Sequence, residues 1–181
     1  MAFAVTLLFD AATAAAIAAR WELLAVAGVS RSMLDLGYRP HVSLVVQDGP
    51  IDAGAAVALD RVFAQVDRMA VTLTGVTTFG PCSGVFYAAL APSPELMGLH
   101  ARTVSAMGDG CHLHYEIGRW TPHCTLATDM SDPEMERASA ILGDDWQPLQ
   151  GFFETAELVE FVPVVSLKRW ALSAPRSTRT P

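Results

Sequence analysis

The sequence predicts an α+β fold for its 181 residues. Segments with the two-residue alternation of strands are interspersed with segments whose apolar residues recur at helical spacing. Two short runs rich in Val, Thr or aromatic residues, 71–79 and 83–90, flank a turn that contains Gly and Pro. Two further extended runs lie close together near the end of the sequence. Antiparallel neighbours are therefore expected, because a uniformly parallel sheet needs a helix between every two strands.

Each element rests on a local signal. Phe3, Val5, Leu7 and Phe9 alternate with the residues between them, which predicts a first strand. Asp10 is placed to cap an Ala-rich helix over 11–27. The same signals predict further strands over 41–46, 71–79, 83–90, from near 122, over 152–161 and over 167–172, and helices over 51–69, 93–107 and 132–142.

The charge of the chain limits its partners. Twelve Lys and Arg face 19 Asp and Glu, for a formal net charge of −7 and a pI near 5.1. Such a surface argues against binding long nucleic acid through its phosphates. A local pocket can still oppose the global sign, so small phosphorylated substrates or RNA ends stay open as partners.

Hydropathy and cysteine usage indicate a cytoplasmic protein without a membrane span. No run reaches the roughly 20 apolar residues that a membrane helix needs, because charged residues keep interrupting. The three cysteines, Cys82, Cys111 and Cys124, are odd in number and form no CxxC pair, which fits a reducing compartment. The oligomeric state is not predicted.

One five-residue pattern occurs twice. Pro40-His41-Val42-Ser43-Leu44 is matched by Pro122-His123-Cys124-Thr125-Leu126, each at the start of an expected strand. A bare His-x-Ser/Thr would arise about 0.7 times by chance in this composition, and the shared Pro and Leu lower that expectation to a few thousandths. The repetition therefore predicts a paired functional site.

The residue types of this pattern suit phosphodiester chemistry. On a strand, residues two apart share a face, so His41 stands beside Ser43 and His123 beside Thr125. One neutral imidazole accepts a proton from the attacking oxygen, and one protonated imidazole gives a proton to the leaving oxygen. The two hydroxyls are placed to donate to phosphate oxygens. Cys124 faces the opposite way, into packing, which makes it a poor nucleophile.

The two motifs resemble those of the two-histidine (2H) phosphoesterases, the family of RNA 2′,5′-ligase-like proteins and cyclic nucleotide phosphodiesterases. The resemblance covers both His-x-Ser/Thr-x tetrads and the order of strands and helices over most of the chain. It implies a pseudo-twofold, bilobal domain over 1–173 with mainly antiparallel sheets lining a central cleft and helices outside. The remaining residues, 174–181, are expected to form a disordered tail, as chain ends commonly do. The resemblance also implies hydrolysis of a cyclic phosphate or a 2′,5′-linked nucleotide or RNA end, reversible as ligation, with catalytic His41 and His123, phosphate-binding Ser43 and Thr125, and no metal or other cofactor.

The sequence departs from the family pattern in two places. Ser43 replaces the more usual Thr of the first tetrad and keeps the hydroxyl. Ala127 and Thr128 stand after the second tetrad, where a basic residue would favour long RNA.

Alternatives remain beside this interpretation. The groove could hold a nucleotide or phosphorylated metabolite without turning it over. His112 and His114, expected on one strand face, could join His123 in a metal site. Arg39 could reach a phosphate or be an exposed strand-end charge, and His100 is expected at the surface or at its boundary.

Overall fold

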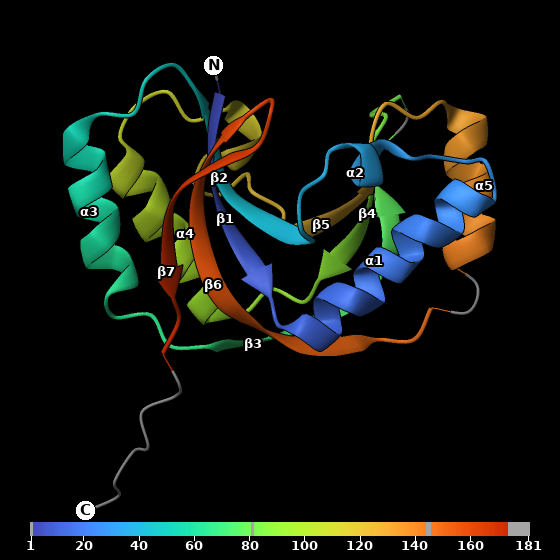
Figure 1. The fold of residues 1–181 in the computed structure, drawn as a ribbon, viewed down its shortest axis with the longest axis horizontal. Coiled ribbons are helices and arrows are strands. Elements are labelled where there is room, and N and C mark those ends of the chain that lie inside the picture. The colour runs from blue at the N-terminus through green and yellow to red at the C-terminus, as the bar shows by residue number, and fades with distance from the viewer. Residues whose placement is uncertain (1, 81, 144–145, 174–181) are drawn as a thin grey trace, which may run out of the picture.

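The computed structural model describes residues 2–80, 82–143 and 146–173 and confirms the α+β fold (Figure 1). The tail predicted at 174–181 lies outside the described residues. The strands are β1 (Ala2–Phe9), β2 (His41–Asp48), β3 (Met69–Thr78), β4 (Phe86–Leu90), β5 (His123–Ala127), β6 (Leu149–Phe161) and β7 (Val165–Ala171). The helices are α1 (Ala11–Val26), α2 (Ser32–Asp35), α3 (Ala53–Phe63), α4 (Pro94–Met107) and α5 (Asp132–Leu142), with a 3₁₀ turn η1 (Leu113–Tyr115).

All the strand pairs among these elements are antiparallel, as expected, and they form one seven-stranded sheet. The order is β2-β1-β6-β3-β4-β5, and β7 pairs with β6 beside this path. β6 connects the two halves, because its first residues pair with β3 and its remaining residues pair with β1 and β7. The motif strands β2 and β5 stand at the two ends of the order, yet they contact each other because the sheet curves and brings its two ends together (Figure 1).

Helices α1, α3, α4 and α5 cover the outer faces of the two halves (Figure 1), whereas residues of α2 line one of the cavities described below. α3 and α4 pack on each other and α4 contacts β2, while α1 and α5 pack on the half that holds β3, β4 and β5. Each half is thus covered in part by a helix that follows a strand of the other half. Within the described residues, no helix has the length and apolar character that crossing a membrane requires.

One predicted helix is shorter than expected, and one predicted strand does not form. The helix predicted over 51–69 ends at Phe63, because Arg68 N–H donates to Ser173 O at 2.6 Å and the chain already enters the sheet at Met69. The segment with His112 and His114 is no strand. The His112 amide bonds Val46 O at 2.8 Å and the Tyr115 amide then bonds His112 O, so the chain turns into η1.

Gly151 of β6 lets the start of α1 approach the sheet. Asp10 caps α1 through Oδ1, which accepts from the amides of Ala12 and Thr13, and its Oδ2 accepts from the Phe152 amide at 2.7 Å. A Cβ at Gly151 would lie 1.8 Å from the Thr13 hydroxyl and 2.8 Å from Asp10 Oδ2. The cap and the strand can therefore coexist only with glycine here.

Gly151→Ala is accordingly expected to lower the free energy of unfolding by about 2 kcal/mol, through overpacking and a damaged cap. Urea denaturation measures the change. Gly75→Ala in β3 is the matched control, because nothing lies within 4 Å of the added methyl group and φ is not positive there. Equal midpoints for the two variants would contradict the steric argument.

Candidate active site

The motif side chains lie where the alternation places them. His41 and His123 are the first residues of β2 and β5, and Ser43 and Thr125 follow on the same faces, toward the groove. The intervening Val42 and Cys124 are fully buried, and so are Leu44 and Leu126. The sequence-based orientation of both strands is confirmed.

The two imidazoles are held in the same way. His41 Nδ1 lies 2.9 Å from Arg39 O, and His123 Nδ1 lies 2.8 Å from Thr121 O. A carbonyl only accepts, so Nδ1 carries the hydrogen in both rings. Nε2 is left as the atom that can take up or release a proton at each histidine.

Two buried tryptophans hold the motif strands through hydrogen bonds to their backbone carbonyls. Trp21 of α1 donates through Nε1 to Thr125 O at 3.2 Å, and Trp120 donates to Ser43 O at 3.0 Å. Trp120 stacks on His100 with ring centroids 4.2 Å apart, and His100 Nε2 bonds Tyr115 O at 2.9 Å. The expectation of a surface or boundary His100 was wrong, since the residue is buried. Each Trp precedes one motif in sequence and supports the other.

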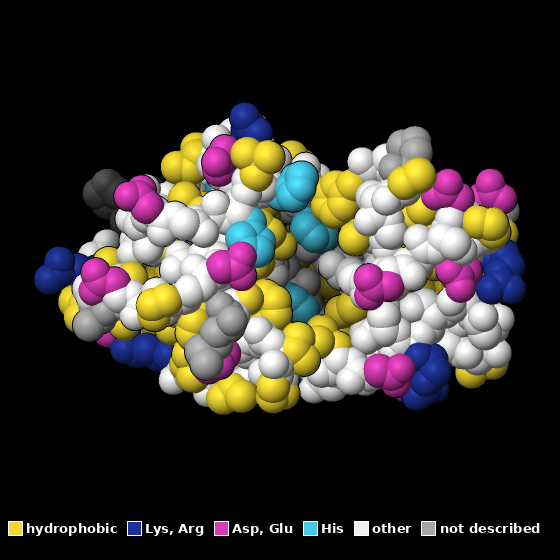
Figure 2. All heavy atoms as spheres, turned by 90° about the horizontal axis from the view of Figure 1, so that it is seen from above, with side chains coloured by type: hydrophobic (Ala, Val, Ile, Leu, Met, Phe, Trp, Pro, Cys, Tyr) yellow, Lys and Arg dark blue, Asp and Glu magenta, His cyan; other side chains and the backbone are white. Residues whose placement is uncertain are grey.

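Two cavities open on the groove, and histidine side chains gather around it (Figure 2). The His41 cavity, of about 420 Å³, includes Ser43 in its lining, and the His123 cavity, of about 640 Å³, includes Thr125. Tyr115 and Thr128 line both. The two motifs therefore meet at a groove with one chamber on either side.

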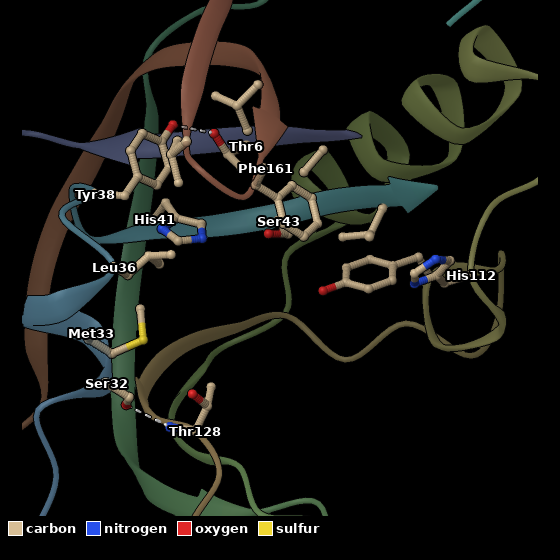
Figure 3. A pocket seen from close by; sticks show the side chains of 15 residues that line it. Thr6, Ser32, Met33, Leu36, Tyr38, His41, Ser43, His112, Thr128 and Phe161 are labelled. Carbon is tan, nitrogen blue, oxygen red and sulfur yellow. Dashed lines mark hydrogen bonds between the residues drawn. The ribbon is translucent and has the colours of Figure 1, made fainter. Parts of the chain in front are cut away.

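Tyr115 of η1 is the aromatic residue that lines both cavities. Burial raises the pKa of Tyr115, so its phenol stays protonated. Figure 3 shows Ser43 beside His41 on β2, both facing the cavity. The sequence pointed to Tyr115 only as one aromatic near a motif.

η1 also separates two histidines that were considered as metal ligands. His112 lines the His41 cavity and His114 lines the His123 cavity. Among the described residues, no group of three or more His, Cys, Asp or Glu is arranged to hold a metal ion. Arg39, also considered as a phosphate contact, is exposed and lines neither cavity.

Burial lowers the pKa of both motif histidines. For His41 the bond to Arg39 O acts in the opposite direction, the neighbouring His123 lowers the pKa further, and Glu157 raises it. For His123 the bond to Thr121 O opposes the effect of burial. The effect of His123 on His41 agrees with the contact between β2 and β5, the strands that begin with these two residues.

The surroundings of the two rings differ. His41 packs against Tyr38, with centroids 4.9 Å apart, and the Tyr38 hydroxyl donates to the buried Glu157 at 2.5 Å. His123 packs edge-on against Phe79 and Tyr87, with centroids 4.8 and 5.2 Å away. One histidine thus has a carboxylate behind it and the other has aromatic rings. No spacing in the sequence connects these partners with the motifs.

The chain is similar to known proteins in sequence family and in fold. The chain matches the family model of the 2′-5′ RNA ligase superfamily over residues 10–162. None of the curated proteins compared with it matches.

Solved structures share the fold. E. coli LigT, complexed with 3′-AMP, has 18% sequence identity and a TM-score of 0.56, with 94% of this chain and 97% of LigT covered. TT0787 of Thermus thermophilus has 16% identity and a TM-score of 0.61, with 97% and 100% covered. Usb1 of Kluyveromyces marxianus has 10% identity and a TM-score of 0.52, with 92% and 97% covered. With the family match over most of its length and a fold shared with these proteins, the chain belongs to the 2′-5′ RNA ligase superfamily, the two-histidine phosphoesterases.

Proposed function

We propose that the protein is a metal-independent phosphodiesterase that opens a cyclic phosphate or cleaves a 2′,5′-linked nucleotide or RNA end. The observation that carries the proposal is the pair of imidazoles at one groove, each with Nδ1 bonded to a carbonyl and Nε2 left for proton transfer. Family membership supports action on phosphodiester bonds in broad terms. The LigT structures that hold 3′-AMP, ATP or NADP⁺ support a small nucleotide as ligand.

The roles of the two histidines follow from their neighbours. Burial and the neighbouring His123 lower the pKa of His41, but its ring packs against Tyr38, whose hydroxyl donates to Glu157, and this carboxylate raises the pKa. His123 lies against uncharged aromatic rings. We therefore assign His41 as the general acid and His123 as the general base.

In ring opening, His123 Nε2 takes a proton from water as the water oxygen bonds to phosphorus. The bond from phosphorus to one ribose oxygen breaks, and that oxygen receives the proton of His41 Nε2. Ser43 and Thr125 donate hydrogen bonds to the non-bridging oxygens, where negative charge builds up in the transition state. The same steps with a ribose 5′-hydroxyl in place of water form a new phosphodiester as the ring opens, which is ligation.

The test is turnover with product analysis. Purified protein is incubated in EDTA with adenosine 2′,3′-cyclic phosphate and, separately, with 2′,5′-linked diadenosine monophosphate. We expect a phosphomonoester from the first and cleavage of the second. Bound but intact ligand after long incubation would overturn the proposal in favour of a nucleotide-binding module, and activity lost in EDTA and restored by a divalent metal would overturn metal independence.

A pH profile tests the assigned roles. The base must be neutral and the acid charged, and burial lowers the pKa of both histidines from 6.5. The bell-shaped profile of kcat/KM is therefore expected to have its optimum below pH 6.5 and to fall about tenfold per unit on the far alkaline side, where the charged form of His41 is lost.

Glu157→Gln separates the two limbs of this profile. Without the carboxylate charge, the pKa of His41 falls and the alkaline limb moves to lower pH, while the acidic limb set by His123 stays in place. A shift of the acidic limb alone would reverse the assignment.

A further inference from the structure

The lining of the His41 cavity is largely apolar and includes a small buried cluster that is separate from the main core. Ala4, Val46 and Val159 form a second buried cluster on the groove side of the sheet, with Phe161 and Val164 packed against it. Met33 and Leu36 of the α2 segment complete the opposite wall (Figure 3). At about 420 Å³, the cavity falls in the range of roughly 300–1,000 Å³ typical of small-molecule sites.

The polar groups around the cavity already have partners. The Thr6 hydroxyl lies 3.0 Å from the Tyr38 hydroxyl, which donates to Glu157. The Ser32 hydroxyl accepts from the Thr128 amide at 2.9 Å (Figure 3). Outside the phosphate centre, this lining therefore has few groups left to solvate a charged ligand.

The charges at the cavity favour no second anion. None of the described residues that line it is Lys or Arg. His112 Nε2 lies 2.9 Å from Asp48 Oδ2, so the imidazole of this lining residue is already paired with a carboxylate. Behind Tyr38, the carboxylate of Glu157 is paired with Arg169, which leaves no net positive charge at that wall. The motif histidines can balance the single negative charge of one phosphodiester, and the rest of the cavity lining offers no cation for a second anion.

We infer that the His41 cavity binds an uncharged, largely apolar ester group on one side of the scissile phosphate, so that the preferred substrates carry a single negative charge. The inference rests on the proposed function and specifies its substrate class. A second anionic group in this cavity would lose part of its hydration without gaining a cation, which weakens its binding.

Two matched esters test the inference. Adenosine 2′-(butyl phosphate) and adenosine 2′-(3-carboxypropyl phosphate) differ by a terminal carboxylate on an arm of the same length. We expect kcat/KM to be at least about tenfold higher for the butyl ester. If the esters are not cleaved, the same ratio is expected in their inhibition constants against cyclic phosphate hydrolysis.

A pair of neighbouring substitutions locates the effect. Val164→Arg places a guanidinium in the cavity lining, and Val165→Arg adds the same charge to an exposed position of β7 outside it. Val164→Arg is expected to raise kcat/KM for the carboxypropyl ester about tenfold relative to kcat/KM for the butyl ester. Val165→Arg is expected to leave the ratio of the two kcat/KM values unchanged. Leu36→Arg, on the opposite wall, serves if Val164→Arg does not fold.

Equal constants for the two esters, or equal responses to the two arginine variants, would overturn the inference. If no phosphodiester is turned over at all, the proposed function fails, and the inference is then decided by titration calorimetry of the two esters with the wild-type protein and both variants. A tenfold ratio of dissociation constants supports it, and equal constants reject it.

Discussion

Alanine at His41 or at His123 is expected to lower kcat/KM by about 10²- to 10⁴-fold, because each substitution removes one of the two proton transfers. The kcat/KM of the double variant is expected to be only slightly lower than that of the less active single variant, since one imidazole alone carries out only one of the two proton transfers. Steady-state hydrolysis of adenosine 2′,3′-cyclic phosphate at the pH optimum measures all three variants.

Two controls separate chemistry from folding. Free imidazole is expected to restore part of the activity of each single variant, which a merely structural histidine would not allow. Cys124 lies between His123 and Thr125 but faces the core, and burial raises the pKa of its thiol to about 12. Cys124→Ala is therefore the second control. We expect that variant to keep its kcat/KM within about threefold of wild type. Full activity in either histidine variant would refute paired-histidine catalysis.

Local signals in the sequence were sufficient for most of the fold. The alternation at the start of β1, the cap at Asp10 and the Ser93 and Asp132-Pro133 starts lie where the structure has them. The orientation of the motif side chains also followed, because a two-residue period fixes which residues share a face. Local patterns do not show that the two motifs face the same groove. That prediction came from the repetition of the motif, which indicated two equivalent strands.

Long-range contacts account for what was not predicted. η1 forms because the His112 amide bonds Val46 in a distant strand, and no local pattern marks that bond. His100 is buried because Trp120 covers its ring. Glu157 looks like an ordinary strand carboxylate until β1 and β7 pair on either side of it. The groups that distinguish the two histidines are therefore visible only in three dimensions.

The same carboxylate leads to the largest expected effect on stability. Thr6, Glu157 and Arg169 are direct neighbours across β1, β6 and β7, and Glu157 is fully buried while the Arg169 side chain is 58% exposed. Arg169 donates to one carboxylate oxygen and Tyr38 to the other. The carboxylate is thus compensated by one cation and one phenol in a place that water does not reach.

Arg169→Leu is expected to lower the free energy of unfolding by about 3 kcal/mol, because it leaves a buried charge without its cation. Replacing both members, as Glu157→Leu with Arg169→Leu, is expected to recover most of that loss, since an apolar pair of similar size has no charge to desolvate. Urea denaturation of the single and double variants measures the coupling. A double variant that is less stable than Arg169→Leu alone would contradict this account. It would mean that the Glu157 carboxylate stabilises the fold without the arginine, and that Tyr38 and Thr6 offset the cost of burying its charge.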